Sequence, residues 1–489
     1  MGIKRLRSGR ENTIVDVWQR EVGQLSSRNF AHRLVASEDL VLKLDIARKL
    51  EKHRGCVNTI SFNASGEILV SGSDDRRVIL WDWEAGRAKL SFHSGHADNI
   101  FQAKFMPYND DRSLVTCGAD GEVRHAHISE GGRVETFLLG THDWRAHKLA
   151  IEPGSPYIFY SSGEDGLVQH FDLRTKAATE LFKCRSTLDS TSDRSIVQLN
   201  AIVIDPRSPN LLAVGGSDEY ARIYDIRRYK GHGSTDLDQP VNYYCPEHLV
   251  NDGSVGITGL AFSDQSELLV SYNADHIYLF AKDMGLGPNP VPSSSLSTHS
   301  DADEPERDVS IGAARSVPQV YKGHCNYVTI KGVSFFGPKS EYVMSGSDCG
   351  RIFIWRKKGG ELIRVMEADR DVVNCIESHP HAAVLASSGI DTDIKIWTPK
   401  AEERATLPTN ITKSRPRHGR WMHDTGSPRE LLMELFTRES HISSREHNRD
   451  DTGSREDLLQ LLMSLGRDTD NSSHDGGDDD ESDPEDFQS

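Results

Sequence analysis

The chain has 489 residues, of which 36% are hydrophobic and 27% charged, and its formal net charge is -17. No run approaches the ~20 apolar residues of a membrane-spanning helix, no apolar segment follows the charged N-terminus, and the seven cysteines include no CxxC pair. These features argue against a membrane span, a secretory signal, a disulfide framework and a zinc ribbon, so we expect a soluble intracellular protein.

Residues 1–39 are expected to form an N-terminal arm outside the main domain. Apolar side chains recur in it at helical spacing: Ile14, Val17, Trp18, Val22 and Leu25. This spacing predicts one short amphipathic helix with an exposed apolar stripe. The alternative is that the stripe packs on the protein's own main domain.

Residues 40–50, LVLKLDIARKL, alternate apolar and polar side chains. A period of two predicts a β-strand over this segment. The segment directly precedes a series of repeats, and we expect its strand to pair with the last repeat and close a ring.

A repeated pattern occupies the middle of the chain. An apolar strand, two small residues and an acidic turn lead into a second strand, as in LVSGSDDRRVILWD (69–82) and LASSGIDTDIKIW (385–397). The second strand ends in the column Trp81, Ala126, Phe171, Tyr224, Phe280, Trp355 and Trp397. The intervals are 45, 45, 53, 56, 75 and 42 residues, so three match a blade of ~40–45 residues and three carry insertions.

A single four-stranded unit cannot bury both faces, so such units pack radially around a centre. The repeat resembles the WD40 family over roughly residues 40–398. This resemblance implies an all-β fold, a seven-bladed WD40 β-propeller with short flanking helices and a disordered acidic tail.

The resemblance also implies a structural hydrogen-bond chain in individual blades. In the first blade it falls on His53, Ser71, Asp75 and Trp81. In the sixth it falls on His324, Ser345 and Trp355, with Cys349 where aspartate is usual. Because these residues recur with the blade period, we interpret them as structural and not as metal or acid–base sites.

Three segments lie outside the repeats. Pro, Ser and acidic residues dominate an insert at about 283–316, which we expect to be disordered. Residues 399–466 are expected to form a linker with two leucine-rich helices, at 427–439 and 454–466. The tail 467–489 contains ten acidic residues and is expected to be a disordered, solvated segment.

Two consecutive repeats end in the same phrase: Phe171-Asp172-Leu173-Arg174 and Tyr224-Asp225-Ile226-Arg227. This aromatic-Asp-x-Arg pair resembles the motif of the cullin-4-associated factors, the substrate receptors of cullin-4 RING ubiquitin ligases. The resemblance implies that Phe171, Asp172, Arg174, Tyr224, Asp225 and Arg227 contact the ligase's propeller adaptor, with the helix around Trp18 as a further contact.

By this resemblance the protein is a non-catalytic subunit that binds the adaptor, and through it cullin-4, on one face and a protein substrate on another, in the nucleus and cytoplasm. No GxSxG, Walker or HExxH motif occurs, and we expect no cofactor, no metal and no direct nucleic-acid binding. The alternative is a WD-repeat scaffold outside the ubiquitin system, such as a chromatin adaptor, with an enzyme a distant third.

Overall fold

The computed structural model describes residues 13–186, 196–229, 239–250, 252–288, 290 and 317–408. The chain divides into two units, residues 1–415 and 416–489, and the second unit lies wholly outside the described residues. The predicted helices at 427–439 and 454–466 and the acidic tail belong to that second unit. Within the described ranges, no helix has the length and apolar character needed to cross a membrane.

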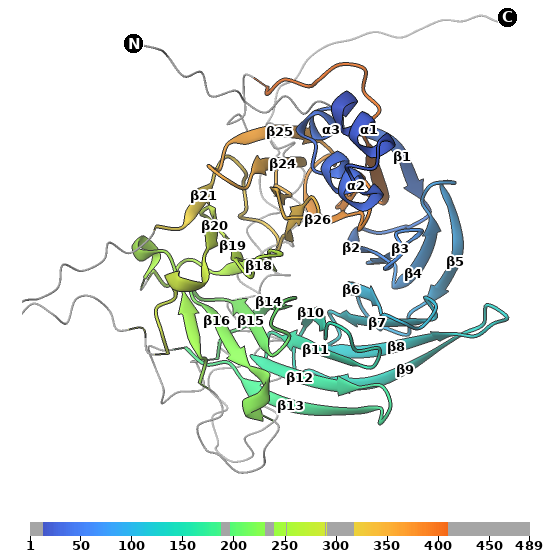
Figure 1. The fold of residues 1–489 in the computed structure, drawn as a ribbon. Helices are drawn as coiled ribbons and strands as arrows, with labels where there is room; N and C mark the ends of the chain where they lie inside the picture. Colours follow the sequence, from blue (N-terminus) through green and yellow to red (C-terminus); the bar gives the residue numbers. More distant parts are fainter. Residues whose placement is uncertain are drawn as a thin grey trace, which may run out of the picture. The chain divides into compact units, whose positions relative to one another are not determined.

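Seven four-stranded antiparallel sheets, numbered as blades 1 to 7 in chain order, surround a common centre (Figure 1). Blade 1 contains β2 (Val57–Phe62), β3 (Ile68–Ser73), β4 (Arg77–Asp82) and β5 (Arg87–His93). Blade 2 contains β6 (Ile100–Phe105), β7 (Ser113–Gly118), β8 (Glu122–Ile128) and β9 (Val134–Thr141). Blade 3 contains β10 (Ala146–Ile151), β11 (Ile158–Gly163), β12 (Leu167–Asp172) and β13 (Ala177–Lys183).

The other four blades repeat this order. Blade 4 contains β14 (Leu199–Ile204), β15 (Leu211–Gly216), β16 (Ala221–Asp225) and β17 (Asn242–Tyr244). Blade 5 contains β18 (Ile257–Phe262), β19 (Leu268–Tyr272), β20 (Ile277–Phe280) and β21 (Gln319–Tyr321). Blade 6 contains β22 (Val333–Phe336), β23 (Tyr342–Ser345), β24 (Arg351–Arg356) and β25 (Leu362–Glu367). Blade 7 contains β26 (Val373–Ser378), β27 (Leu385–Gly389), β28 (Asp393–Thr398) and β1 (Asp45–Glu51).

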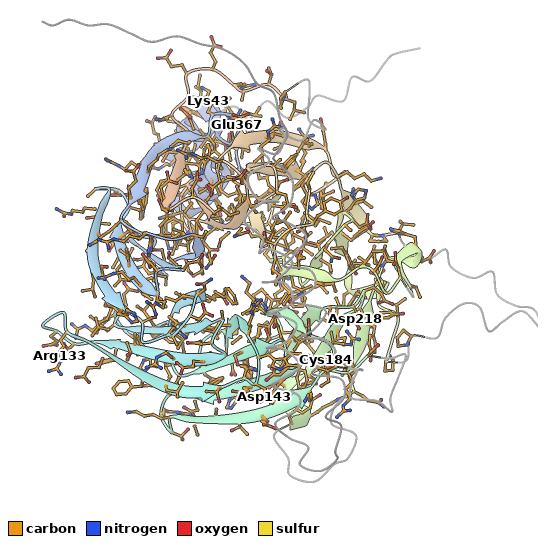
Figure 2. All side chains as sticks on the ribbon, turned by 180° about the vertical axis from the view of Figure 1, so that it is seen from behind. Lys43, Arg133, Asp143, Cys184, Asp218 and Glu367 are labelled. Atoms are coloured by element: carbon orange, nitrogen blue, oxygen red, sulfur yellow. The ribbon has the colours of Figure 1, made fainter. Side chains whose placement is uncertain are left out.

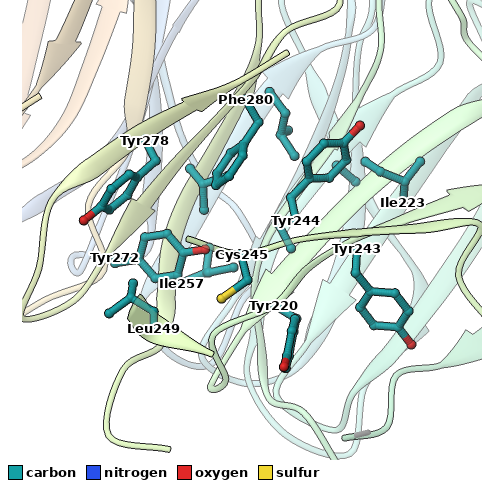
Figure 3. Close-up of a cluster of buried hydrophobic side chains, with 14 of the residues drawn as sticks. Tyr220, Ile223, Tyr243, Tyr244, Cys245, Leu249, Ile257, Tyr272, Tyr278 and Phe280 are labelled. Atoms are coloured by element: carbon teal, nitrogen blue, oxygen red, sulfur yellow. The ribbon is translucent and has the colours of Figure 1, made fainter. Parts of the chain in front are cut away.

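The predicted seven-bladed β-propeller is thus confirmed. The first strands of neighbouring blades lie beside one another around the centre, including β2 beside β26 where the ring closes. Apolar side chains fill the space between blades. One cluster, between blades 4 and 5, is rich in tyrosines, among them Tyr220, Tyr243, Tyr244, Tyr272 and Tyr278 (Figure 3).

The ring closes through β1, which pairs antiparallel with β28 from Asp45 opposite Thr398 to Glu51 opposite Asp393. The strand predicted over 40–50 therefore begins later than expected, because Glu38–Leu42 form the helix α3. Val41 and Leu44 are fully buried against side chains of blades 6 and 7. Val41 and Leu44 are three residues apart, a spacing that suits a docked helix, whereas the alternation of apolar residues in this segment suits a strand. The contact of these two side chains with blades 6 and 7 selects the helix.

The arm contains two further helices, α1 (Thr13–Glu21) and α2 (Ser27–Val35), where one helix was predicted. The hydroxyl of Ser26 caps α2 by accepting a hydrogen bond from the backbone of Asn29 at 3.3 Å. Short 3₁₀ helices follow three strands: η2 (Ile226–Tyr229), η3 (Glu247–Leu249) and η4 (Lys282–Met284).

The insert expected to be disordered from about residue 283 is ordered at its start. The backbone of Leu286 donates to the carbonyl of Tyr243 at 2.8 Å, and that of Gly287 donates to the side-chain oxygen of Asn242 at 2.9 Å. Leu286 also packs against the tyrosine-rich cluster, which the local Pro and Ser composition does not reveal. Residues 289 and 291–316 lie outside the described residues.

Candidate protein-interaction site

In blade 3, Asp172 is the last residue of β12 and Arg174 lies two residues later, in the turn to β13. The backbone N–H of Arg174 donates to Asp172 Oδ1 at 2.9 Å. The guanidinium then folds back, with Nε 3.0 Å from Oδ1 and Nη2 2.7 Å from Oδ2. We call this two-pronged contact the Asp172–Arg174 fork. The arginine side chain is 59% exposed, so the fork lies at the surface.

Blade 4 repeats the fork at the end of β16. Arg227 Nε lies 3.0 Å from Asp225 Oδ1, Nη2 lies 2.6 Å from Oδ2, and the backbone N–H of Arg227 donates to Oδ1 at 3.1 Å. The Arg227 side chain is 65% exposed. The two neighbouring blades therefore present the same exposed guanidinium in the same local geometry.

Each fork favours the charged forms of both partners. The arginine hydrogen bond, followed by smaller contributions from the backbone N–H and the arginine charge, lowers the pKa of Asp172 and of Asp225. The same contact raises the pKa of Arg174 and of Arg227. Exposed ion pairs contribute little to folding stability. Their effect here is to orient a planar donor group whose other N–H groups remain available to a partner.

The two aromatic residues of the motif are buried, in contrast to their predicted role in adaptor contact. Phe171 is 1% exposed and stacks on Phe159, with ring centroids 4.7 Å apart. Tyr224 is 1% exposed and stacks on Phe182, and its hydroxyl lies 3.7 Å from the sulfur of Cys184, which is labelled in Figure 2. Both rings belong to the apolar clusters between neighbouring blades, and the Asp and Arg residues of the motif reach the surface.

Both forks lie on one face of the ring. The backbone N–H of Leu173 donates to the carbonyl of Tyr157 at 3.0 Å, and that of Ile226 donates to the carbonyl of Asn210 at 2.8 Å. These bonds join the turn after the third strand of each blade to the turn between its first and second strands. We call the face that carries these two sets of turns the arginine face.

The apolar stripe of α1 is exposed, which differs from the alternative that it packs on the main domain. Trp18 is 54% exposed, Ile14 86% and Val22 50%, whereas Leu25 is buried. Helix α1 packs on α2 through an ion pair of 2.6 Å between Arg33 and Asp16.

The arm is anchored far from the forks. Arg356 of blade 6 holds Glu38 of α3 with N–O distances of 2.8 to 3.0 Å, and the hydroxyl of Tyr342 donates to the carbonyl of Ala36 at 2.8 Å. Residues after β28 also run along α3, where Arg404 contacts Asp39 at 2.5 Å. The structure therefore does not bring Trp18 together with Arg174 and Arg227, because the helices lie across the ring from β12 and β16 (Figure 1).

The structural hydrogen-bond chain is present in blade 1. His53 Nδ1 lies 2.9 Å from Asp75, His53 Nε2 lies 2.7 Å from the hydroxyl of Ser71, and Trp81 Nε1 donates to the same hydroxyl at 2.8 Å. Blade 3 contains the same His–Asp–Ser arrangement at His142, Asp165 and Ser161, which the sequence analysis did not assign.

Blade 6 lacks the chain that was mapped onto it. Neither ring nitrogen of His324 has a hydrogen-bond partner among the described residues, and burial lowers its pKa to about 4. Trp355 donates instead to the carbonyl of Lys322 at 2.9 Å, and Ser345 contacts the carbonyl of Gly346. Cys349 stands where Asp75 orients the imidazole in blade 1, and the neighbouring carboxylate of Asp348 pairs with Lys331 instead of with His324.

A buried lysine replaces the histidine chain in blade 7. Lys395 is fully buried and contacts Asp369 at 2.7 Å and Asp391 at 2.8 Å, with Asp393 beside it. Burial raises the pKa of Asp369 to about 6, although Lys395 opposes this shift, and the carboxylates raise the pKa of Lys395 despite its burial. The repeated pattern does not reveal this cluster, because Asp369 lies outside it.

One group with metal-ligating side chains occurs among the described residues: His96, Asp120 and Glu122. His96 Nδ1 lies 3.0 Å from Asp120, and His96 Nε2 lies 2.9 Å from Thr116. Glu122 pairs with Arg124 at 2.6 Å. These contacts already use the ligand atoms, and the group is the blade 2 version of the structural chain.

Comparison with known proteins identifies the repeats. The family described as WD domain, G-beta repeat (WD40) matches residues 45–82, 315–356 and 360–398. Protein ALTERED SEED GERMINATION 2 of Arabidopsis thaliana is 35% identical over 53% of this chain and 38% of its own length. DDB1- and CUL4-associated factor 6 of Homo sapiens is 34% identical over 54% of this chain and 31% of its own length.

A third relative aligns over more of both chains. WD and tetratricopeptide repeats protein 1 of Homo sapiens is 23% identical over 80% of this chain and 90% of its own length. The chain spans only about a third of the length of the first two relatives. Repeat pattern, topology and family matches agree that the chain is a seven-bladed β-propeller built from WD repeats.

Proposed function

We propose that this protein is a non-catalytic substrate-recognition subunit of a cullin-4 RING ubiquitin ligase. It binds the propeller adaptor, DDB1, through the arginine face and a protein substrate through another surface, in the nucleus and cytoplasm. The observation that carries this proposal is the pair of identical exposed forks in blades 3 and 4. Similarity to DDB1- and CUL4-associated factor 6 supports it. As part of this proposal, the chain is a counterpart of the eighth cullin-4-associated factor, which rests on the resemblance of sequence segments such as residues 336–355 in blade 6.

The forks suit recognition of another protein. A guanidinium donates two parallel hydrogen bonds to a carboxylate or to backbone carbonyls, and such charge-assisted bonds are stronger than neutral ones. Asp172 and Asp225 fix the arginines before binding, which reduces the side-chain entropy lost on association. Two such donors on neighbouring blades give a partner two fixed points and so define its orientation.

The exposed stripe of α1 provides a second, separate contact in this proposal. An amphipathic helix with exposed Ile14, Val17 and Trp18 fits a hydrophobic groove of a partner. Because the arm is anchored on blades 6 and 7, it reaches a different part of the adaptor from the forks. Contacts made through two separate elements increase the total affinity, so loss of one weakens binding without removing it.

The test is the affinity of the purified full chain for purified DDB1, with co-purification of cullin-4 from cells. The double variant Arg174→Ala, Arg227→Ala should weaken binding ~30-fold or more while the melting temperature stays the same. The matched control is Arg87→Ala. Arg87 contacts Asp82 at 3.4 Å at the equivalent strand end of blade 1, where the motif is absent.

Trp18→Ala should weaken binding separately from the forks, and combining it with the arginine double variant should reduce binding further. Wild-type protein that does not bind DDB1 would refute the proposed function. Binding that the arginine double variant and Arg87→Ala leave equally intact would refute the role of the forks.

A further inference from the structure

One turn on the arginine face has an unusual backbone. Between β6 and β7, three non-glycine residues have positive φ angles: Tyr108 at 59°, Asp110 at 48° and Asp111 at 58°. Residues with a Cβ rarely adopt this left-handed backbone conformation, and residues with bulky side chains do so least often. Tyr108 is 78% exposed, so packing of its side chain does little to offset the strain.

Contacts with both neighbouring blades hold this turn in place. The side chain of Asn63, from blade 1, donates to Asp111 at 2.7 Å. The side chain of Asn109 donates to the carbonyl of Pro156, from blade 3, at 3.1 Å. Strained residues that surrounding structure holds in this way tend to occur at functional sites. The ring of Tyr108 is therefore displayed from a fixed backbone.

The turn leads directly to the fork of blade 3. Pro156 is followed by Tyr157, which is 41% exposed. The guanidinium carbon of Arg174 lies 5.5 Å from the centre of that ring. The turn that carries Tyr108 in blade 2 is thus linked through Asn109 and Pro156 to Tyr157 and Arg174 in blade 3. Tyrosine and arginine are the residue types that, with tryptophan, dominate binding energy in protein interfaces.

The charge of this region differs from that of the whole chain, which is -17. Among the described residues, the turns of the arginine face in blades 3 and 4 expose three cations besides the forks: Lys176, Arg207 and Arg228. Two acidic residues that the structure describes in these turns accept hydrogen bonds from the protein itself: Glu152 from Tyr160 and the buried Asp205 from Ser266. In blades 3 and 4 this surface is complementary to a partner that presents carboxylates beside apolar groups, whereas the blade 2 turn adds the aromatic ring of Tyr108 beside Asp110 and Asp111.

We infer that Tyr108 and Tyr157 extend the adaptor-binding surface from the forks of blades 3 and 4 onto blade 2. This inference rests on the proposed function, and its occupant is the same folded adaptor. Tyr108 supplies an exposed aromatic anchor, and Tyr157 supports Arg174 from below while contacting the partner with its free edge.

The test uses the strained backbone at Tyr108, because a substitution that relieves the strain there should not lower stability but should weaken adaptor binding. Asparagine tolerates the left-handed region, so Tyr108→Asn should leave the melting temperature unchanged or raise it. The same variant should weaken binding of the full chain to purified adaptor by ~10-fold. Tyr157→Ala should weaken it by a similar factor, and Tyr157→Phe, which keeps the ring under Arg174, should bind nearly as wild type.

The matched control is Trp144→Ala. Trp144 is 51% exposed and lies between β9 and β10, in the turns of the opposite face. Its loss should leave adaptor binding unchanged. Equal weakening by Trp144→Ala, or a fall in melting temperature that accompanies weaker binding in Tyr108→Asn, would overturn the inference.

Failure of this inference is distinguishable from failure of the proposed function. If the arginine double variant binds weakly while Tyr108→Asn and Tyr157→Ala bind as wild type, the extension onto blade 2 is wrong and the forks remain the contact. If wild-type protein does not bind the adaptor, the proposed function fails and this inference fails with it.

Discussion

Replacement of Lys395 by methionine tests how blade 7 is held together. Lys395 and Asp369 are both fully buried and 2.7 Å apart, with Asp391 at 2.8 Å from the same ammonium. Methionine keeps most of the side-chain volume but removes the charge, which leaves the Asp369 carboxylate buried without its cation. Breaking one side of a buried pair costs about 3–5 kcal/mol.

The loss of unfolding free energy in Lys395→Met should depend on pH, and the direction of this dependence follows from the pKa of Asp369. In the wild type its pKa is about 6, above the usual 3.8, because burial outweighs the attraction of Lys395. A carboxyl group whose pKa is raised by folding contributes its stability at low pH and loses it as pH rises to the folded pKa. Without Lys395 that pKa rises further, so the variant should keep losing about 1.4 kcal/mol per pH unit above pH 6, where the wild-type contribution of this group levels off.

The assay is urea unfolding and thermal melting of wild type and Lys395→Met at pH 5.5, 7 and 8, since urea leaves charge interactions unscreened. Lys49→Met is the control, because Lys49 makes an exposed pair of 3.4 Å with Asp393, and it should cost less than about 1 kcal/mol. The double variant Lys395→Met, Asp369→Asn should recover part of the stability and lose the pH dependence. A deficit that is the same at pH 5.5 and 8, or no larger than that of Lys49→Met, would refute the reasoning.

Three further predictions concern the fold. A chain that begins at Gly55 lacks β1 and exposes the edge of β28, so it should melt at lower temperature and aggregate more than a chain that begins at Glu38; equal solubility and melting would contradict ring closure by β1. His53→Leu should destabilise the protein by about 2 kcal/mol in urea unfolding, because Ser71 and Asp75 lose a buried partner. His324→Leu should be nearly neutral, because the ring nitrogens of His324 make no hydrogen bond among the described residues. Equal losses in the two variants would show that the hydrogen-bond chain of blade 1 does not contribute to stability. Removal of residues 467–489 should leave the melting temperature unchanged, since Phe487 is the only large apolar residue in their sequence and offers little surface to offset ordering entropy. Amide-exchange protection across 470–485 would contradict this.

The sequence by itself determined the number of blades and the place of both forks. Three features recur with the period of a blade: the alternation of apolar residues, the small-residue pair and the acidic turn. Each of them lies within one short segment, so it can be recognised without knowing what that segment contacts in the fold. The Asp-x-Arg forks are local in the same sense, because two residues and one turn suffice to form them.

Only the tertiary structure decided how other segments are used. The alternation of residues 40–44 suited a strand, but Glu38–Leu42 form a helix, and Val41 and the following Leu44 are buried against blades 6 and 7. Phe171 and Tyr224 belong to the motif by sequence, yet packing between blades makes them core residues. The pairing of Lys395 with Asp369 and the strained turn at Tyr108 depend on residues 26 and 48 positions away, respectively, and contacts at that range do not appear in a local pattern.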